Sequence, residues 1–144
     1  MLITVENTIK KPSTQEPQKN INYDLLDKLK YALETEKRYL DANLTISLLA
    51  KELHTNREYL SRTINHYFGK NYTDLLNEYR VKSAIHLFED ITNGTVNNCT
   101  MLQVAHTSGF KSTSTFNPAF KKMMGVTPSG FKKRVKAGNA KVQN

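Results

Sequence analysis

Apolar residues recur at i+3 and i+4 spacing along most of the chain, which predicts α-helices, and no stretch indicates a strand. The first helix is expected from about Asn22 to about Tyr39. Thr45 is expected to cap a second helix, because its hydroxyl can accept a backbone hydrogen bond at the helix start. The inward residues of these two helices are predicted to be Leu25, Leu29, Ala32, Leu33, Ile46, Leu49, Ala50 and Leu53.

The third and fourth helices are bounded by clearer capping patterns. The run Thr55-Asn56-Arg57-Glu58 is typical of a capping box that starts the third helix, and Gly69 is expected to end it. Asn71 is expected to cap a long fourth helix to about Ile91, with no Gly or Pro inside it. The predicted buried residues are Leu60, Ile64, Tyr67 and Phe68 in the third helix, and Leu75, Leu76, Tyr79, Ala84, Leu87 and Phe88 in the fourth.

Three further helices are predicted after a polar loop over residues 92–98. Gly125 is expected to end the sixth helix, and Pro128 stands at the first position of the seventh, where no backbone donor is needed. The expected N-caps are Thr100, Ser112 and Thr127. The inward residues are predicted to be Met101, Val104, Ala105, Phe116, Phe120 and Phe131.

Pro118 interrupts the pattern of the sixth helix. Proline lacks a backbone N–H, so a position deep inside a helix costs about 3 kcal/mol. Two alternatives follow from the sequence. Either the helix kinks at Pro118, or its regular part begins there with Asn117 as the cap.

An internal repeat organises these elements. When the sequence is aligned with itself at a shift of 56 positions, five residues fall opposite residues with the same predicted role. These roles are core residue, core residue, helix end, helix cap and core residue. The matched pairs are Leu60 with Phe116, Ile64 with Phe120, Gly69 with Gly125, Asn71 with Thr127, and Leu75 with Phe131. The sequence therefore predicts an all-α protein of about seven helices, with two helix-turn-helix subdomains joined by a long linking helix.

The same pattern predicts the domain organisation. The first subdomain and the linking helix are expected at residues 22–91, and the second subdomain at residues 92–136. Residues 1–21 are polar and are interpreted as a flexible tail or linker, and residues 137–144 as a second flexible tail.

The residues around the second helix-turn-helix resemble a known family. The matching positions are Val104-Ala105, Gly109-Phe110, Phe116, Phe120-Lys121-Lys122, Gly125, Thr127-Pro128 and Phe131. They resemble the second helix-turn-helix of AraC/XylS-type bacterial transcription regulators. The first copy, LLAKELHTNREYLSRTINHYFG, also fits, so the resemblance covers roughly Asp24 to Arg134. At Pro118 the sequence departs from the family, which often has Arg or Lys there.

The resemblance implies a function. It implies sequence-specific binding of double-stranded DNA by the C-terminal output domain of a larger cytoplasmic regulator, with two recognition helices in adjacent major grooves. A sensor domain is expected upstream of this chain, and RNA polymerase is expected as a partner of the full regulator.

The distribution of charge agrees with a nucleic-acid partner. The formal net charge is +8, and all thirteen acidic residues lie at or before Asp90. The last 54 residues hold eight Lys and Arg and no acid. A segment of this kind favours a polyanion as its binding partner. Nucleic acid is the first choice and an anionic membrane surface the second. The alternatives are a solvated basic face, or a helical protein-interaction module whose basic face binds an acidic partner.

Candidate DNA contacts lie on the exposed faces of the third and sixth helices and after the sixth. Arg62 is the best candidate for a bidentate contact to guanine, and Asn117 for adenine. Glu58 is interpreted as a cap, and Lys132, Lys133 and Arg134 as phosphate contacts. The full candidate set is Asn56, Arg57, Ser61, Arg62, Asn65, Ser112, Thr113, Ser114, Asn117, Lys121, Lys132, Lys133 and Arg134.

The sequence offers no pattern for catalysis or cofactor binding. The single cysteine, Cys99, excludes an internal disulfide framework, and it does not pair with any of the four histidines at a zinc-like spacing. No phosphate-binding glycine loop or nucleophile motif occurs. No apolar run approaches the ~18–20 residues of a membrane span. We therefore expect neither an enzyme, nor a metal or cofactor site, nor membrane insertion by this chain.

Overall fold

The computed structural model describes residues 22–138 of the 144-residue chain. Within this range the chain forms seven α-helices and no strand, as predicted. The elements are α2 (Tyr23–Lys30), the π-helical turn η1 (Tyr31–Thr35), the 3-10 turn η2 (Arg38–Leu40), α3 (Ile46–Glu52), α4 (Arg57–Phe68), α5 (Tyr72–Thr92), α6 (Met101–Thr107), α7 (Thr113–Met124) and α8 (Pro128–Lys136). The expected tails at 1–21 and 137–144 lie outside the described residues, apart from Ala137 and Gly138.

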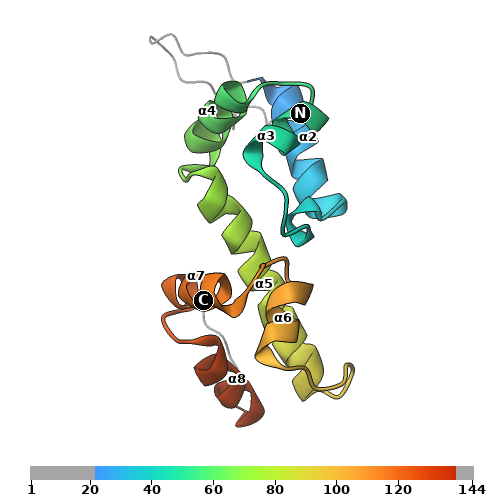
Figure 1. Cartoon of the computed structure of the whole chain (residues 1–144), viewed down its shortest axis with the longest axis vertical. Helices are drawn as coiled ribbons and strands as arrows, with labels where there is room; N and C mark the ends of the chain where they lie inside the picture. Colours follow the sequence, from blue (N-terminus) through green and yellow to red (C-terminus); the bar gives the residue numbers. More distant parts are fainter. Residues whose placement is uncertain (1–21, 139–144) are drawn as a thin grey trace, which may run out of the picture.

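The long helix α5 connects two groups of helices. Helices α2, α3 and α4 gather around its N-terminal half, and α6, α7 and α8 around its C-terminal half (Figure 1). Leu75 and Leu76 of α5 enter the first hydrophobic core, whereas Val81, Ala84 and Phe88 enter the second. One helix therefore contributes to both cores.

The second core is built largely from aromatic side chains. Phe116 and Phe120 are fully buried on one face of α7, and their ring centroids lie 5.7 Å apart. The ring of Phe120 packs edge to face against Phe88 of α5 and Phe131 of α8, with ring centroids 6.0 and 5.5 Å apart. Such pairs stabilise a core beyond the area that they bury. The core thus fixes α7 against both α5 and α8.

Local capping residues define most helix ends as predicted. The side chains of Thr45, Asn71, Thr100, Ser112 and Thr127 each accept a backbone N–H at a helix start. Gly69 and Gly125 end α4 and α7 with φ of 70° and 79°, which glycine adopts without a steric cost. The helices α4 and α7 begin 56 positions apart and have twelve residues each, which confirms the repeat.

Two sequence predictions in the first group were wrong. The first helix does not reach Tyr39: its helical path ends at Thr35, and Lys37 takes a left-handed φ of 51° before η2. Contacts distant in sequence hold the chain in this turn: Arg38 donates two hydrogen bonds to Glu52, at 3.0 and 2.7 Å, and the carbonyls of Tyr39 and Asp41 accept hydrogen bonds from Arg80. Tyr67 was expected to be buried, but its exposed fraction is 43% and the ammonium of Lys30 lies over its ring.

Candidate nucleic-acid interface

The first candidate recognition element is α3, a four-residue turn and α4. Asn56 is the N-cap of α4, since its Oδ1 accepts the backbone N–H of Tyr59 at 2.8 Å. The capping box predicted for Thr55 and Glu58 is therefore wrong. Asparagine in extended backbone caps as well as threonine, and here it lies one residue closer to the helix. The carboxylate of Glu58 does not close a capping box and is exposed on the first turn.

The remaining predicted residues of α4 lie on one exposed side. Arg57, Arg62 and Asn65 are exposed and Ser61 is half-buried, whereas Leu60 and Ile64 are fully buried on the opposite side. The guanidinium of Arg62 lies 5.8 Å from the centroid of the Tyr59 ring, a distance that permits a cation–π contact. Tyr59 is thus placed to orient Arg62 toward solvent.

The second candidate recognition element is α6, the turn 108–112 and α7. The hydroxyl of Ser112 accepts the backbone N–H of Thr115 at 3.3 Å and lies 3.2 Å from the hydroxyl of Ser114. Thr113 is half-buried, whereas Ser114, Asn117 and Lys121 are exposed. Ser112 therefore caps the helix, and the other polar groups form a continuous surface on its outer side.

Pro118 lies inside α7, not at its start. The helix begins at Thr113 with Ser112 as its cap, so the alternative in which Asn117 caps a helix that starts at Pro118 is wrong. Proline cannot donate to the carbonyl of Ser114, four residues earlier. Because Pro118 is exposed, the missing hydrogen bond lies on the solvent side of the helix.

The basic residues of α8 do not share one environment. The Lys132 ammonium donates to Oδ1 of Asn98 at 2.9 Å and lies 3.5 Å from the Cys99 carbonyl, so it ties α8 to the loop before α6. This engagement argues against the prediction that Lys132 contacts phosphate. Lys133 and Arg134 are exposed in the last turns of α8.

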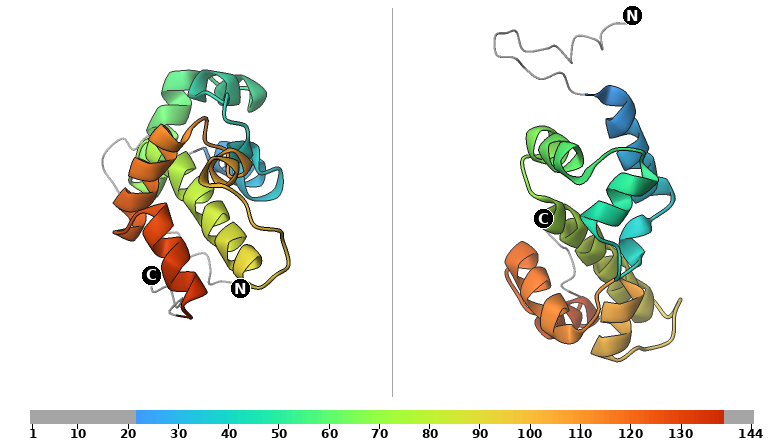
Figure 2. Two further views of the ribbon diagram at one scale, coloured as in Figure 1. Left: turned by 60° about the horizontal axis from the view of Figure 1, so that its bottom comes forward. Right: turned by 45° about the horizontal axis from the view of Figure 1, so that its top comes forward.

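The two recognition elements lie at different points along α5. In Figure 1, α4 lies above the N-terminal end of α5 and α7 lies to the left of its middle, and the right-hand view of Figure 2 shows the same order, with α4 in green and α7 in orange. An ion pair between Lys122 of α7 and Asp74 of α5, at 3.4 Å, connects the second element to the start of the linking helix. The arrangement can present two polar helix faces to one long partner.

The described residues hold neither a metal-binding cluster nor a membrane span. In residues 22–138, no group of three or more His, Cys, Asp or Glu side chains could hold a metal ion. His86 and Glu89 form a pair at the surface, with Nδ1 and Oε1 3.7 Å apart, and no third ligand joins them among the described residues. No helix of the described part is both long and apolar enough to cross a lipid bilayer.

Two residues whose positions suggest a functional role were not predicted from the sequence. Glu58 was interpreted as a cap, but its exposed position beside Ser61 and Arg62 places it on the outer side of α4. The preference of asparagine for the N-cap at Asn56 could have revealed this. Arg80 was not among the candidate residues, because the two carbonyl groups that it binds, those of Tyr39 and Asp41, lie 41 and 39 positions away in sequence.

Comparison with known proteins decides the family. A family model described as a helix-turn-helix domain matches residues 49–134, which is more than half of the chain. The chain belongs to the AraC-type helix-turn-helix family. A search of curated proteins gave no match.

Solved structures share the fold of this AraC-type chain. The C-terminal domain of AraT, a response regulator from Geobacillus stearothermophilus, is 24% identical, with a TM-score of 0.65 over 79% of this chain and 87% of that one. The C-terminal domain of the two-component response regulator yesN from Fusobacterium nucleatum is 25% identical, with a TM-score of 0.60 over 77% and 98%. The DNA-binding domain of AdpA, solved with a target DNA, is 19% identical, with a TM-score of 0.67 over 82% and 97%.

Proposed function

We propose that this AraC-type domain binds double-stranded DNA sequence-specifically, as the output domain of a bacterial transcription regulator, with α4 and α7 in successive major grooves. The main support for the proposal is that α4 and α7 are both capped helices with exposed polar residues, and that the two hydrophobic cores hold them at different points along α5. An α-helix fits the major groove of B-DNA, where base edges are distinguishable.

The length of α5 fits this geometry. Its 21 residues span about 31 Å at 1.5 Å per residue. Successive major grooves on one face of B-DNA are about 34–36 Å apart. The length of α5 is therefore close to the groove spacing, and one chain carries both recognition helices. The distance between them is set by where each packs on α5, since Lys122 of α7 reaches Asp74 near the start of that helix.

The base contacts are assigned to exposed groups whose donors and acceptors match base edges. Arg62 is assigned to guanine, because its planar fork matches the O6 and N7 acceptors, and Asn117 to adenine. Glu58, on the same side of α4 as Arg62, can accept from the amino group of cytosine. Since α4 and α7 carry different exposed residues, the two half-sites should differ in sequence.

The phosphate contacts are assigned to cations at the edges of the same surface. Arg57 and Lys121 are exposed on α4 and α7, and Lys133 and Arg134 on α8. The start of α7, at Ser112 and Thr113, presents backbone N–H groups of the kind that bind phosphate oxygens. Cations of this type position a protein on DNA without selecting a sequence.

The remaining partners follow from the family. AdpA was solved with a target DNA, and the AraT and yesN structures are C-terminal domains of response regulators. By analogy, a sensor or receiver part upstream and RNA polymerase in the full regulator would be the partners of this domain, in the bacterial cytoplasm.

Selection of bound duplexes from a random pool tests the proposal. We expect enriched DNA with two different conserved segments about one helical turn apart, bound by a single chain. Weak binding that is equal for all sequences would instead support the rival hypothesis, in which the basic face binds an acidic protein.

A salt titration separates positioning from sequence preference. Replacing Lys133 and Arg134 with Gln should weaken binding to every duplex alike. The slope of log affinity against log salt should fall by up to about 0.9 for each phosphate that is no longer neutralised. Lys132→Gln is the matched control, because its ammonium is already engaged by Asn98, and it should leave the slope nearly unchanged. An unchanged slope in the double variant would show that these cations face away from DNA.

A further inference from the structure

Arg80 lies on α5 between the two hydrophobic cores. Leu75 and Leu76, just before it, belong to the first core, and Val81 and Ala84, just after it, belong to the second. Arg80 itself is half-buried and belongs to neither core. Its side chain therefore lies at the junction of the two helical groups.

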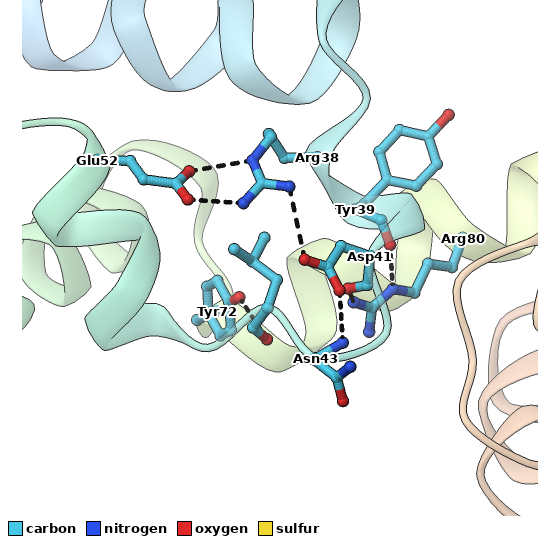
Figure 3. A network of polar contacts seen from close by, with 8 residues as sticks. Arg38, Tyr39, Asp41, Asn43, Glu52, Tyr72 and Arg80 are labelled. Carbon is cyan, nitrogen blue, oxygen red and sulfur yellow. Dashed lines mark hydrogen bonds and ion pairs between the residues drawn. The ribbon is translucent and has the colours of Figure 1, made fainter.

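The guanidinium of Arg80 contacts both groups. Its Nε donates to the Tyr39 carbonyl at 2.6 Å and its Nη2 to the Asp41 carbonyl at 3.1 Å, both at the end of the first group (Figure 3). Its Cζ lies 5.9 Å from the centroid of the Phe110 ring, in the turn that precedes α7. One side chain thus links η2 to the turn of the second helix-turn-helix.

Gly109 brings that turn close to the same carbonyl. It adopts a φ of 97°, and a Cβ at this position would lie 2.4 Å from the Tyr39 carbonyl oxygen and 3.0 Å from Nε of Arg80. Any larger residue would have to push the turn away from η2 or displace Arg80 from its acceptor. The close approach and the hydrogen bond therefore depend on each other.

Arginine is well suited to this position. In the described part of the chain no carboxylate lies within ion-pair distance of Arg80, so its charge is stabilised by carbonyl dipoles and an aromatic ring. Burial lowers the pKa of Arg80, but a guanidinium stays charged in proteins. Its planar fork donates to two carbonyls while its Cζ lies over the Phe110 ring, and a lysine ammonium lacks this fork.

The contacts around Arg80 add to the coupling that α5 provides. Each core holds its own helices to one half of α5, and the Lys122–Asp74 pair connects α7 to the start of that helix. That pair is exposed, and exposed ion pairs contribute little. The Arg80 and Gly109 contacts, in contrast, join η2 directly to the turn before α7.

We propose that Arg80 and Gly109 form a clamp that holds α4 and α7 at one spacing and rotation, and so sets the distance between half-sites that the domain accepts. Arg80 is a positioning residue in this account, because it acts through the orientation of the two recognition helices. The consequence for DNA rests on the proposed bipartite binding, whereas the clamp itself can be tested without DNA.

The first experiment measures the distance between the two groups in the free 144-residue chain. His66 of α4 and Met123 of α7 are exposed and are replaced by cysteine for spin labelling, in a Cys99→Ser background. Pulsed electron resonance should give one narrow distance distribution with Arg80 present and a clearly broader one in Arg80→Gln. Lys82→Gln, which removes an exposed cation from the same helix, should keep the narrow distribution.

Two outcomes decide this measurement. An equally narrow and unshifted distribution in folded Arg80→Gln would overturn the clamp. If Arg80→Gln does not fold, Arg80→Lys takes its place. It keeps the charge but lacks the fork, and the clamp again requires a broader distribution than in the parent chain.

The second experiment uses duplexes that carry the two selected half-sites with spacers changed one base pair at a time. The parent chain should prefer one spacer by about tenfold or more, and Arg80→Gln should reduce that preference to about threefold or less. Binding to each half-site alone should change little, which separates the clamp from general unfolding.

The two hypotheses fail in different ways. If Arg80→Gln binds all duplexes more weakly but keeps the spacer preference of the parent chain, the clamp is refuted and bipartite binding is not. A parent chain that shows no bipartite site would refute the proposed function, and the distance measurement would then decide on the clamp alone.

Discussion

Pro118 removes a backbone hydrogen bond inside α7 and so lowers the stability of this helix. Pro118→Ala should therefore stabilise the domain. Pro118 is the sixth residue of α7, beyond the first turn in which backbone N–H groups are unpaired in any case. Alanine would restore a donor for the Ser114 carbonyl and remove the clash of the ring with it, a gain of about 3 kcal/mol. The unfolded state of the alanine variant has more conformational entropy, which reduces this gain by about 0.4–1 kcal/mol.

The net expectation is an increase of about 2 kcal/mol in the free energy of unfolding. The core packing stays intact, because Pro118 is exposed. Urea titration followed by circular dichroism measures the effect, and the midpoint should rise while the denaturant slope stays the same. Pro128→Ala is the matched control. Pro128 is buried at the first position of α8, where a missing N–H costs nothing, so its replacement should destabilise the chain. An unchanged or lower stability of Pro118→Ala would refute the reasoning.

Three further changes test other parts of the account. Ser108→Ala should raise the free energy of unfolding by about 1 kcal/mol, because the buried Ser108 hydroxyl has no partner among the described residues; a loss of stability in urea would contradict this. Burial raises the pKa of Tyr72 and of Tyr79 to about 12, so the folded chain binds these protons more tightly than the unfolded chain. The contribution of these two tyrosines to the free energy of unfolding should therefore be complete below about pH 10 and be lost as the pH rises toward about 12. Tyr72→Phe should make this alkaline loss of stability less steep, and an unchanged slope in the variant would contradict the role of Tyr72. Arg62→Ala should reduce discrimination at one base position by about 1–3 kcal/mol at an unchanged melting temperature, and equal discrimination at all positions would exclude Arg62 as a base contact.

The sequence predicted those features of the fold that depend on neighbouring residues. The caps at Asn71 and Ser112, and the glycine ends of α4 and α7, involve groups within a few positions of one another. The two cores also followed from the sequence, because helical spacing fixes which residues share a face. The internal repeat then indicated the arrangement of the two helix-turn-helix units.

Features that depend on distant contacts could not be predicted in this way. The turn after the first helix is held by the pairing of Arg38 with Glu52, and Lys132 is engaged by Asn98 in the loop before α6. The role of Arg80 requires knowing that the Tyr39 carbonyl lies beside α5. The candidate surface on α4 and α7 was predicted from exposure, but which cations are already engaged was visible only in the structure.

The most direct test of the account is a hydroxyl-radical footprint of the 144-residue chain on a duplex selected for tight binding. We expect two protected segments of different sequence, about one helical turn apart on one face of the DNA, with one chain bound per duplex. Protection of a single segment, or binding that requires a symmetric palindrome and two chains, would contradict it.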